Sequence, residues 1–222
     1  MLSTRRAMPI VVLSCLLAAG CKSGSLGNLS PSESATSGAA SASSGAGGAA
    51  RTIAVGAGPQ KKYAVQQQPA ADSCHYRYEK GEPLEDLACT PGAISPAVTQ
   101  ANLKTTICRK GGYTSGVRPS TYVTGKEKKL NAASYGYTGA MGEAEYDHLI
   151  SLQLGGDPND PRNLWVEPSD PGHKRSQGVN NLKDPVETKL HTAVCAGKVT
   201  LAQAQQAIVT DWTTALTRLG LS

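Results

Sequence analysis

The stretch that decides the fold runs from Glu145 to Trp165 and reads EYDHLISLQLGGDPNDPRNLW. An adjacent carboxylate and imidazole, Asp147 and His148, meet an apolar run, and a Gly-Gly pair follows. Fifteen residues after the histidine, Asn163 opens an Asn-Leu-Trp segment with the composition of a strand. These three polar side chains, placed between apolar segments, are the first candidates for a functional site.

Hydrolysis of a phosphodiester by water needs a base for the nucleophile and a cation for the charge on the phosphate. Asp147 offers a hard oxygen ligand suited to Mg²⁺, and His148 has an ordinary pKa near the working pH of a general base. Neighbours in a regular strand point to opposite faces, so both serve one phosphate only if the strand ends or bulges there. The Leu-Gly-Gly sequence that follows permits such a loop.

Two helices are predicted downstream. The first has Asp184 as N-cap and Pro185 at its first position, and it ends at Gly197. The second is capped by Thr200 and ends at Gly220. Apolar residues recur at three- and four-residue steps in both, which indicates one buried face on each helix. These residues are Val186, Leu190, Ala193 and Val194 in the first helix, and Leu201, Ala204, Ile208, Trp212, Ala215 and Leu219 in the second.

Upstream, Ser95 and Pro96 indicate the start of a helix that continues to Cys108 and is stopped by two glycines. The segment from Gly112 to Tyr137 then places basic residues among tyrosines. Two interpretations of this segment stay open: a solvated helix and loop, or a flank that contacts phosphates. The basic residues are Arg118, Lys126, Lys128 and Lys129.

Changes in composition divide the sequence into three regions. Residues 1–21 combine two arginines, an uncharged run and Cys21, the layout of a signal peptide, and Leu-Ala-Ala-Gly-Cys resembles a bacterial lipobox in which Cys21 is acylated. Ala18 stands where leucine is more usual, so an ordinary cleaved signal is the alternative. Residues 22–71 are rich in Ser, Gly and Ala and are expected to form a disordered tether. Residues 72–222 are expected to form the folded domain, exported to the periplasm or cell surface and anchored by lipid.

Six cysteines minus Cys15 and Cys21 leave four in the mature chain. Export favours disulfides, and the absence of a CxxC pair argues against a zinc ribbon. Four cysteines allow three pairings, and the sequence does not choose among them. We favour Cys74–Cys89 and Cys108–Cys195, because the first closes a short loop-rich segment and the second ties the front of the domain to a late helix.

The net charge of the chain is +5, and it becomes +3 without Arg5 and Arg6, since 20 basic residues then face 17 acidic ones. This mild excess is compatible with a nucleic-acid partner and does not require one. The sequence contains no Phe, so a modest core braced by disulfides is expected. We therefore expect a monomeric α+β domain with few strands.

The pattern DHLIxLxLGG, then NLW, then N-x-K-D with a helix resembles the HNH-type (ββα-metal) endonucleases, and more narrowly small bacterial HNH-like proteins. The resemblance covers about Thr90 to Leu219. It implies a ββα-metal core with flanking helices, and the spacing from Asp-His to Asn-Leu suits two strands joined by the loop from Gly155 to Pro161. The implied activity is hydrolysis of DNA, with RNA as a second substrate, at low sequence selectivity.

The resemblance also implies a role for each matching residue. Asp147 stands at the first metal-ligand position, His148 at the general-base position and Asn163 at the position that braces the loop and orients the base. The third ligand is His173 or Asn181, and we favour Asn181 because it directly precedes the capped helix. The implied metal is Mg²⁺, with Mn²⁺ or Zn²⁺ as alternatives. Candidates for contacts with flanking phosphates are Lys174, Arg175 and Lys183.

A second hypothesis belongs to another class of protein. A surface lipoprotein could keep the HNH-like fold without activity and bind nucleic acid or an envelope component. The ambiguity between His173 and Asn181 keeps this hypothesis open. Binding that EDTA does not affect, without cleavage in any metal, would favour it.

Overall fold

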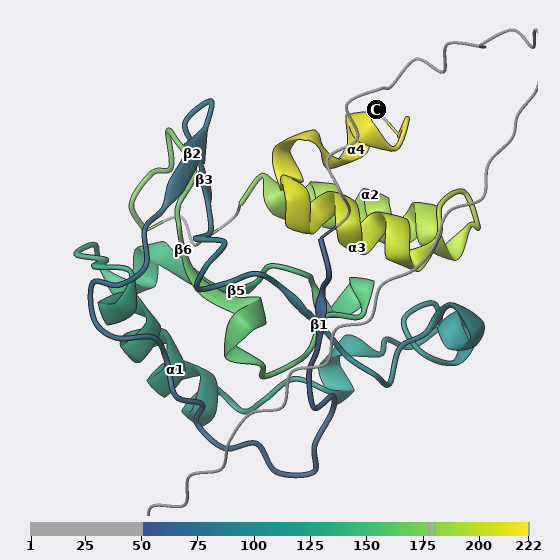
Figure 1. The fold of residues 1–222 in the computed structure, drawn as a ribbon, viewed down its shortest axis with the longest axis horizontal. Helices are drawn as coiled ribbons and strands as arrows, with labels where there is room; N and C mark the ends of the chain where they lie inside the picture. Colours follow the sequence, from purple (N-terminus) through teal and green to yellow (C-terminus); the bar gives the residue numbers. More distant parts are fainter. Residues whose placement is uncertain (1–50, 177–178, 180, 222) are drawn as a thin grey trace, which may run out of the picture. The chain divides into compact units, whose positions relative to one another are not determined.

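A computed structural model describes residues 51–176, 179 and 181–221 of the 222-residue chain. These residues form helices and small two-stranded sheets, which confirms the predicted α+β class (Figure 1). The predicted signal at residues 1–21, its Cys21 and the first part of the predicted tether, residues 22–50, lie outside the described residues.

None of the helices in the described ranges is long and apolar enough to cross a membrane.

The Glu145–Trp165 stretch forms a hairpin. Strand β5 (Ala144–His148) pairs antiparallel with β6 (Leu164–Pro168), and Asp147 lies opposite Trp165. Between the strands, the chain forms the 3-10 helices η4 (Leu152–Leu154) and η5 (Pro161–Asn163). A Cβ at Gly156 would lie 1.7 Å from the Ile150 carbonyl oxygen, so only glycine fits this turn. The predicted two strands and connecting loop are confirmed.

Helices cover the hairpin from two sides (Figure 1). Helix α1 (Thr121–Ser134) lies against β6, where Asn131 Oδ1 accepts the Val166 N–H at 2.7 Å. Helix α2 (Lys183–Cys195) packs against η4. The main core lies on this second side and joins the residues after β5 to the C-terminal helices; its fully buried members include Leu149, Ile150, Leu154, Leu190 and Ala204.

The downstream helices form with two differences from the sequence prediction. Helix α2 begins at Lys183, so Asp184 lies in its first turn and is not its N-cap. The predicted last helix is divided into α3 (Leu201–Thr210), η6 (Trp212–Thr214) and α4 (Ala215–Arg218). The break occurs at Asp211, because its carboxylate accepts the Thr213 N–H at 2.9 Å and caps a new turn. Periodic apolar residues continue across the break, which is why the sequence suggests one helix.

The helix predicted from Ser95 to Cys108 is wrong. The chain forms only the 3-10 helix η1 (Gln100–Thr105), with a kink at Asn102. The Asn102 side chain accepts the Thr99 N–H at 2.8 Å and donates to the Ala97 carbonyl at 3.1 Å, and these bonds compete with a regular helix.

Smaller elements complete the domain. Strand β1 (Ala54–Val55) pairs parallel with β4 (Ala93–Ile94), and β2 (Arg77–Glu79) pairs antiparallel with β3 (Glu82–Leu84). The remaining 3-10 helices are η2 (Thr114–Gly116) and η3 (Met141–Glu143).

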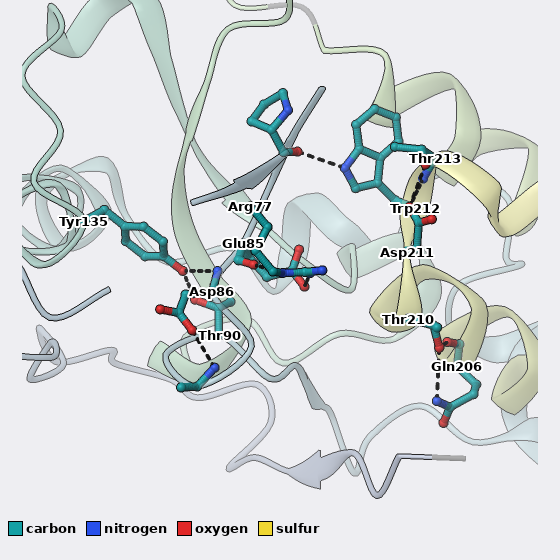
Figure 2. A network of polar contacts seen from close by, with 12 residues as sticks. Arg77, Glu85, Asp86, Thr90, Tyr135, Gln206, Thr210, Asp211, Trp212 and Thr213 are labelled. Carbon is teal, nitrogen blue, oxygen red and sulfur yellow. Dashed lines mark hydrogen bonds and ion pairs between the residues drawn. The ribbon is translucent and has the colours of Figure 1, made fainter. Parts of the chain in front are cut away.

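Polar contacts join β2, β3 and the loop after them to α1 and the C-terminal helices (Figure 2). The Tyr135 hydroxyl lies 2.8 Å from Thr90 Oγ1 and accepts the Asp86 N–H at 3.1 Å. The Trp212 indole N–H donates to the Pro83 carbonyl at 3.2 Å. These contacts therefore hold β3 itself and the loop that follows it.

Both favoured disulfides are confirmed. Cys74 and Cys89 are joined with their Cα atoms 5.9 Å apart, and Cys108 and Cys195 with theirs 5.6 Å apart. The second bond links the segment after η1 to the end of α2. It spans 87 residues, so it restricts the unfolded chain more than the first, which spans 15.

The second part of the predicted tether is wrong, because residues 51–71 belong to the folded domain. In addition to the pairing of β1 with β4, the Gly58 N–H donates to Asp157 Oδ2 at 2.6 Å, and the Gln66 N–H donates to Glu127 Oε1 at 2.7 Å. The segment is held mainly by backbone and polar contacts. A composition argument based on apolar residues therefore cannot detect it.

Deleting residues 1–71 is expected to destabilise the domain, compared with a chain that begins at Arg51. Six long-range hydrogen bonds that involve a side chain are lost. At ~0.5 kcal/mol or more for each bond, the free energy of unfolding should fall by at least about 3 kcal/mol. The measurement is urea unfolding of both chains, followed by circular dichroism. Equal midpoints for the two chains would show that the segment contributes nothing to stability.

Candidate active site

Asp147 and His148 are the last two residues of β5, where the strand ends at the turn toward η4. The His148 side chain is almost fully buried, and the Asp147 side chain is 12 % exposed. The end of the strand thus places a carboxylate and an imidazole next to one another at the edge of the core.

The His148 ring has a defined tautomer. Its Nε2 lies 3.1 Å from the Pro158 carbonyl oxygen. A carbonyl oxygen only accepts, so Nε2 carries the proton and Nδ1 carries the free lone pair. Burial lowers the pKa of His148 to about 4, although the neighbouring Asp147 charge opposes this effect. The expected pKa near the working pH is therefore wrong: the imidazole is neutral there and able to accept a proton at Nδ1.

Asn163 holds the loop that supplies this contact. Its Oδ1 accepts the Ile150 N–H at 3.0 Å, and its Nδ2 donates to the Ile150 and Asp157 carbonyls at 3.0 and 3.1 Å. Asp157 directly precedes Pro158, so the amide fixes the turn after His148 relative to the imidazole's hydrogen-bond partner. This is the bracing position that the resemblance implies for Asn163.

Lys183 lies beneath the strand end and is not a phosphate contact, because its side chain is 1 % exposed. Its ammonium donates to Asp147 Oδ2 at 2.6 Å, to the His148 carbonyl at 2.9 Å and to Glu187 Oε1. These carboxylates raise the pKa of Lys183 well above its ordinary value, despite the opposing effect of burial. The first turn of α2 is thus attached to the end of β5 by one buried cation.

Protons complete the charge balance of this cluster. Burial raises the pKa of Glu187 to about 7, and burial together with Asp147 raises the pKa of Glu167 well above its usual range. Burial and the Asp147 charge thus both favour the protonated form of Glu167, and neither of its side-chain oxygens has a hydrogen-bond partner among the described residues. A single lysine thus pairs with Asp147 and Glu187, and the raised pKa values of Glu187 and Glu167 limit the negative charge of the cluster.

The structure separates the two candidates for the third ligand. His173 Nε2 lies 2.7 Å from Glu143 Oε2, which places it before the start of β5. Four residues of extended chain, about 13 Å, separate Glu143 from Asp147. His173 is therefore paired with Glu143, and Asn181 remains the favoured candidate for the third ligand. Asn181 lies two residues before Lys183 and is buried, with no hydrogen-bond partner for Oδ1 or Nδ2 among the described residues.

The side-chain oxygens of Asp147 and Asn181 suit a hard divalent cation in kind. Asp147 keeps Oδ1 beside the oxygen bound by Lys183, and Asn181 offers an amide oxygen without a partner. In the part of the chain that the structure describes, only Cys108, His191 and Cys195 form a cluster of three ligand-type side chains. Its two sulfurs are joined in a disulfide, so they are not free thiolates.

Three buried charged residues of the site are absent from the sequence prediction: Lys183 as an internal cation, Glu167 and Glu187. The sequence does indicate two of them as a pair. Glu187 lies four residues after Lys183, and side chains at this spacing meet on one face of a helix. Glu167 is the one charged residue in the segment Leu164–Pro168, and a carboxylate in such a strand indicates a buried partner.

Comparison with protein-family models, with curated proteins and with solved structures finds no match to this chain.

Proposed function

We propose that this protein is a metal-dependent nuclease that hydrolyses the phosphodiester bonds of DNA, with RNA as a second substrate and with low sequence selectivity. Strands β5 and β6 and helix α2 would form the ββα-metal core of the HNH type. The observation that carries the proposal is the His148 tautomer, which leaves Nδ1 free at the edge of the core while Nε2 is held by Pro158.

The proposed reaction uses His148 as general base. Nδ1 accepts a proton from water, the water oxygen bonds to phosphorus, and the phosphorus–oxygen bond to the leaving sugar breaks. The leaving oxygen takes a proton from solvent. Asn163 keeps the imidazole aimed, because it fixes the loop that includes Pro158. Lys183 keeps the Asp147 carboxylate in place through Oδ2.

Asp147 and Asn181 would hold the divalent cation that the resemblance implies, with Mg²⁺ as the first choice and Mn²⁺ or Zn²⁺ as alternatives. Such a cation offsets charge on the phosphate and on the leaving oxygen. Both residues offer oxygen atoms, as Mg²⁺ prefers.

We also propose export of a monomeric protein to the periplasm or cell surface, with a lipid anchor at Cys21. The two disulfides support this location, because disulfides persist in oxidising compartments.

Asn181→Ala and His173→Ala test the metal site as a pair. The assay is cleavage of plasmid, single-stranded DNA and RNA in Mg²⁺, Mn²⁺, Zn²⁺ or EDTA. Asn181→Ala should raise the metal concentration at half-maximal rate by at least about tenfold. Asn181→Asp should retain cleavage, since it keeps an oxygen ligand, and His173→Ala should match the unmodified chain. Loss of cleavage in His173→Ala alone would reverse this assignment. If the unmodified chain leaves every substrate intact with every metal, the nuclease proposal is wrong.

One observation favours the second hypothesis, an inactive HNH-like fold that binds nucleic acid or an envelope component. Asp147 already pairs with the buried Lys183 ammonium through Oδ2, so its charge is balanced without a metal. This alternative predicts binding of nucleic acid that EDTA leaves unchanged, together with no cleavage in any of the three metals.

A further inference from the structure

A groove of about 530 Å³ lies between the segment Gln60–Val65 and the start of α1. The segment belongs to the stretch that composition assigns to a tether, but here it is fixed in place. The Tyr63 hydroxyl donates to the Val117 carbonyl at 2.6 Å, and the Ala64 carbonyl accepts from Asn159 Nδ2 at 2.9 Å. The groove therefore has two defined walls.

The groove is basic. Lys61 and Lys62 on one wall and Arg118 on the other line it, and all three residues are exposed. None of the residues that line it is acidic. Three cations without an acid around one hollow favour an anionic ligand with several charges.

Two hydrogen bonds link one wall of the groove to His148, through the adjacent residues Pro158 and Asn159. Asn159, which bonds to the groove wall at Ala64, directly follows Pro158, whose carbonyl oxygen accepts from the His148 ring. Arg118 also acts on both His148 and Glu145. Burial lowers the pKa of His148 and the Arg118 charge adds to this fall, whereas burial raises the pKa of Glu145 and the Arg118 charge opposes this rise. A ligand in the groove would therefore have its charge close to the proposed general base.

Tyr122 adds an aromatic surface to the same groove. Tyr122 is 68 % exposed, and Lys126 lies 4.2 Å from the centre of its ring. An exposed tyrosine beside cations is the arrangement on which unpaired bases stack. Bases in a duplex are already stacked on one another, so this ring distinguishes single strands from double strands.

We propose that this groove binds single-stranded nucleic acid, with phosphates on Lys61, Lys62 and Arg118 and a base on Tyr122, and leads the strand to His148. The last step rests on the proposed nuclease function, whereas the binding itself does not. The segment before the β5–β6 hairpin is thus part of the substrate site.

The test is fluorescence anisotropy of a labelled oligothymidylate with the purified chain in EDTA, so that binding is measured without metal-dependent cleavage. The groove variant is Lys61→Ala/Lys62→Ala/Arg118→Ala. Its control is Lys104→Ala/Lys189→Ala/Lys198→Ala, which removes the same charge from three other exposed positions.

The groove variant should bind at least about thirtyfold more weakly than the control. Its slope of log affinity against log salt should be smaller by about 2, because three phosphate contacts are lost. Tyr122→Ala should weaken binding about tenfold and Tyr122→Phe should not, since a phenyl ring still stacks. Equal affinities for the groove variant and the control would overturn the proposal. Binding by the groove without cleavage by the unmodified chain would refute the nuclease function alone.

Discussion

Replacing Lys183 by methionine is expected to lower the free energy of unfolding by about 4 kcal/mol, because breaking a buried ion pair leaves its partner charge without compensation. The side chain is 1 % exposed, and its ammonium donates to Asp147, to Glu187 and to the carbonyl at the end of β5. Methionine fills a similar volume and leaves little cavity. The lost stability therefore measures mainly the charge and the hydrogen bonds of Lys183. Urea unfolding at pH 7 is the measurement.

Lys189→Met is the matched control, because Lys189 lies on the same helix and is exposed. Its unfolding midpoint should not change. A second readout comes from pH. Without the lysine, protonation removes the unpaired negative charge of the buried carboxylates. Burial already raises the pKa of Glu187 to about 7, so this protonation is nearly complete at pH 5. The loss in Lys183→Met should therefore be smaller at pH 5 than at pH 7. Equal losses at both pH values would contradict the charge explanation.

The hairpin and α2 could be predicted because local patterns determine them. The Gly-Gly pair marks a turn where Gly156 has no room for a side chain. Asn163 directly precedes β6, and its side chain makes three hydrogen bonds to the loop between the strands. The buried face of α2 follows from its periodic apolar residues. The lengths of the loops that the cysteines close favour one pairing, and the structure shows both of its bonds.

What could not be predicted depends on tertiary contacts. Lys183 in a polar helix start has the composition of an exposed residue, and its burial follows only from its position under β5. Residues 51–71 contain few large apolar residues, of which Ile53 packs against the main core, and long-range hydrogen bonds such as Gly58 to Asp157 hold most of the segment. The pKa of His148 depends on burial, and a sequence gives only its ordinary value.

The largest effect on function is expected for His148→Ala, which should slow cleavage about 10³-fold, as loss of a general base does. His75→Ala is the control, because His75 is exposed and donates only its backbone N–H to Asp86. Added imidazole should restore part of the rate in His148→Ala, which a purely structural role would not allow. Unchanged cleavage in His148→Ala would remove the base from the mechanism.

The same residue makes a prediction about pH. Burial lowers its pKa to about 4, so in EDTA the imidazole should stay neutral, with the proton on Nε2, until the pH approaches 4, as measured by NMR. Because the folded pKa lies below the ordinary value of 6.5, this group contributes stability above pH 6.5 that is lost as the pH falls toward 4. His148→Ala should therefore lose less stability than the unmodified chain between pH 6.5 and 4. A titration midpoint near 6.5 would mean that solvent reaches the ring freely, and the buried base at the end of β5 would then be wrong.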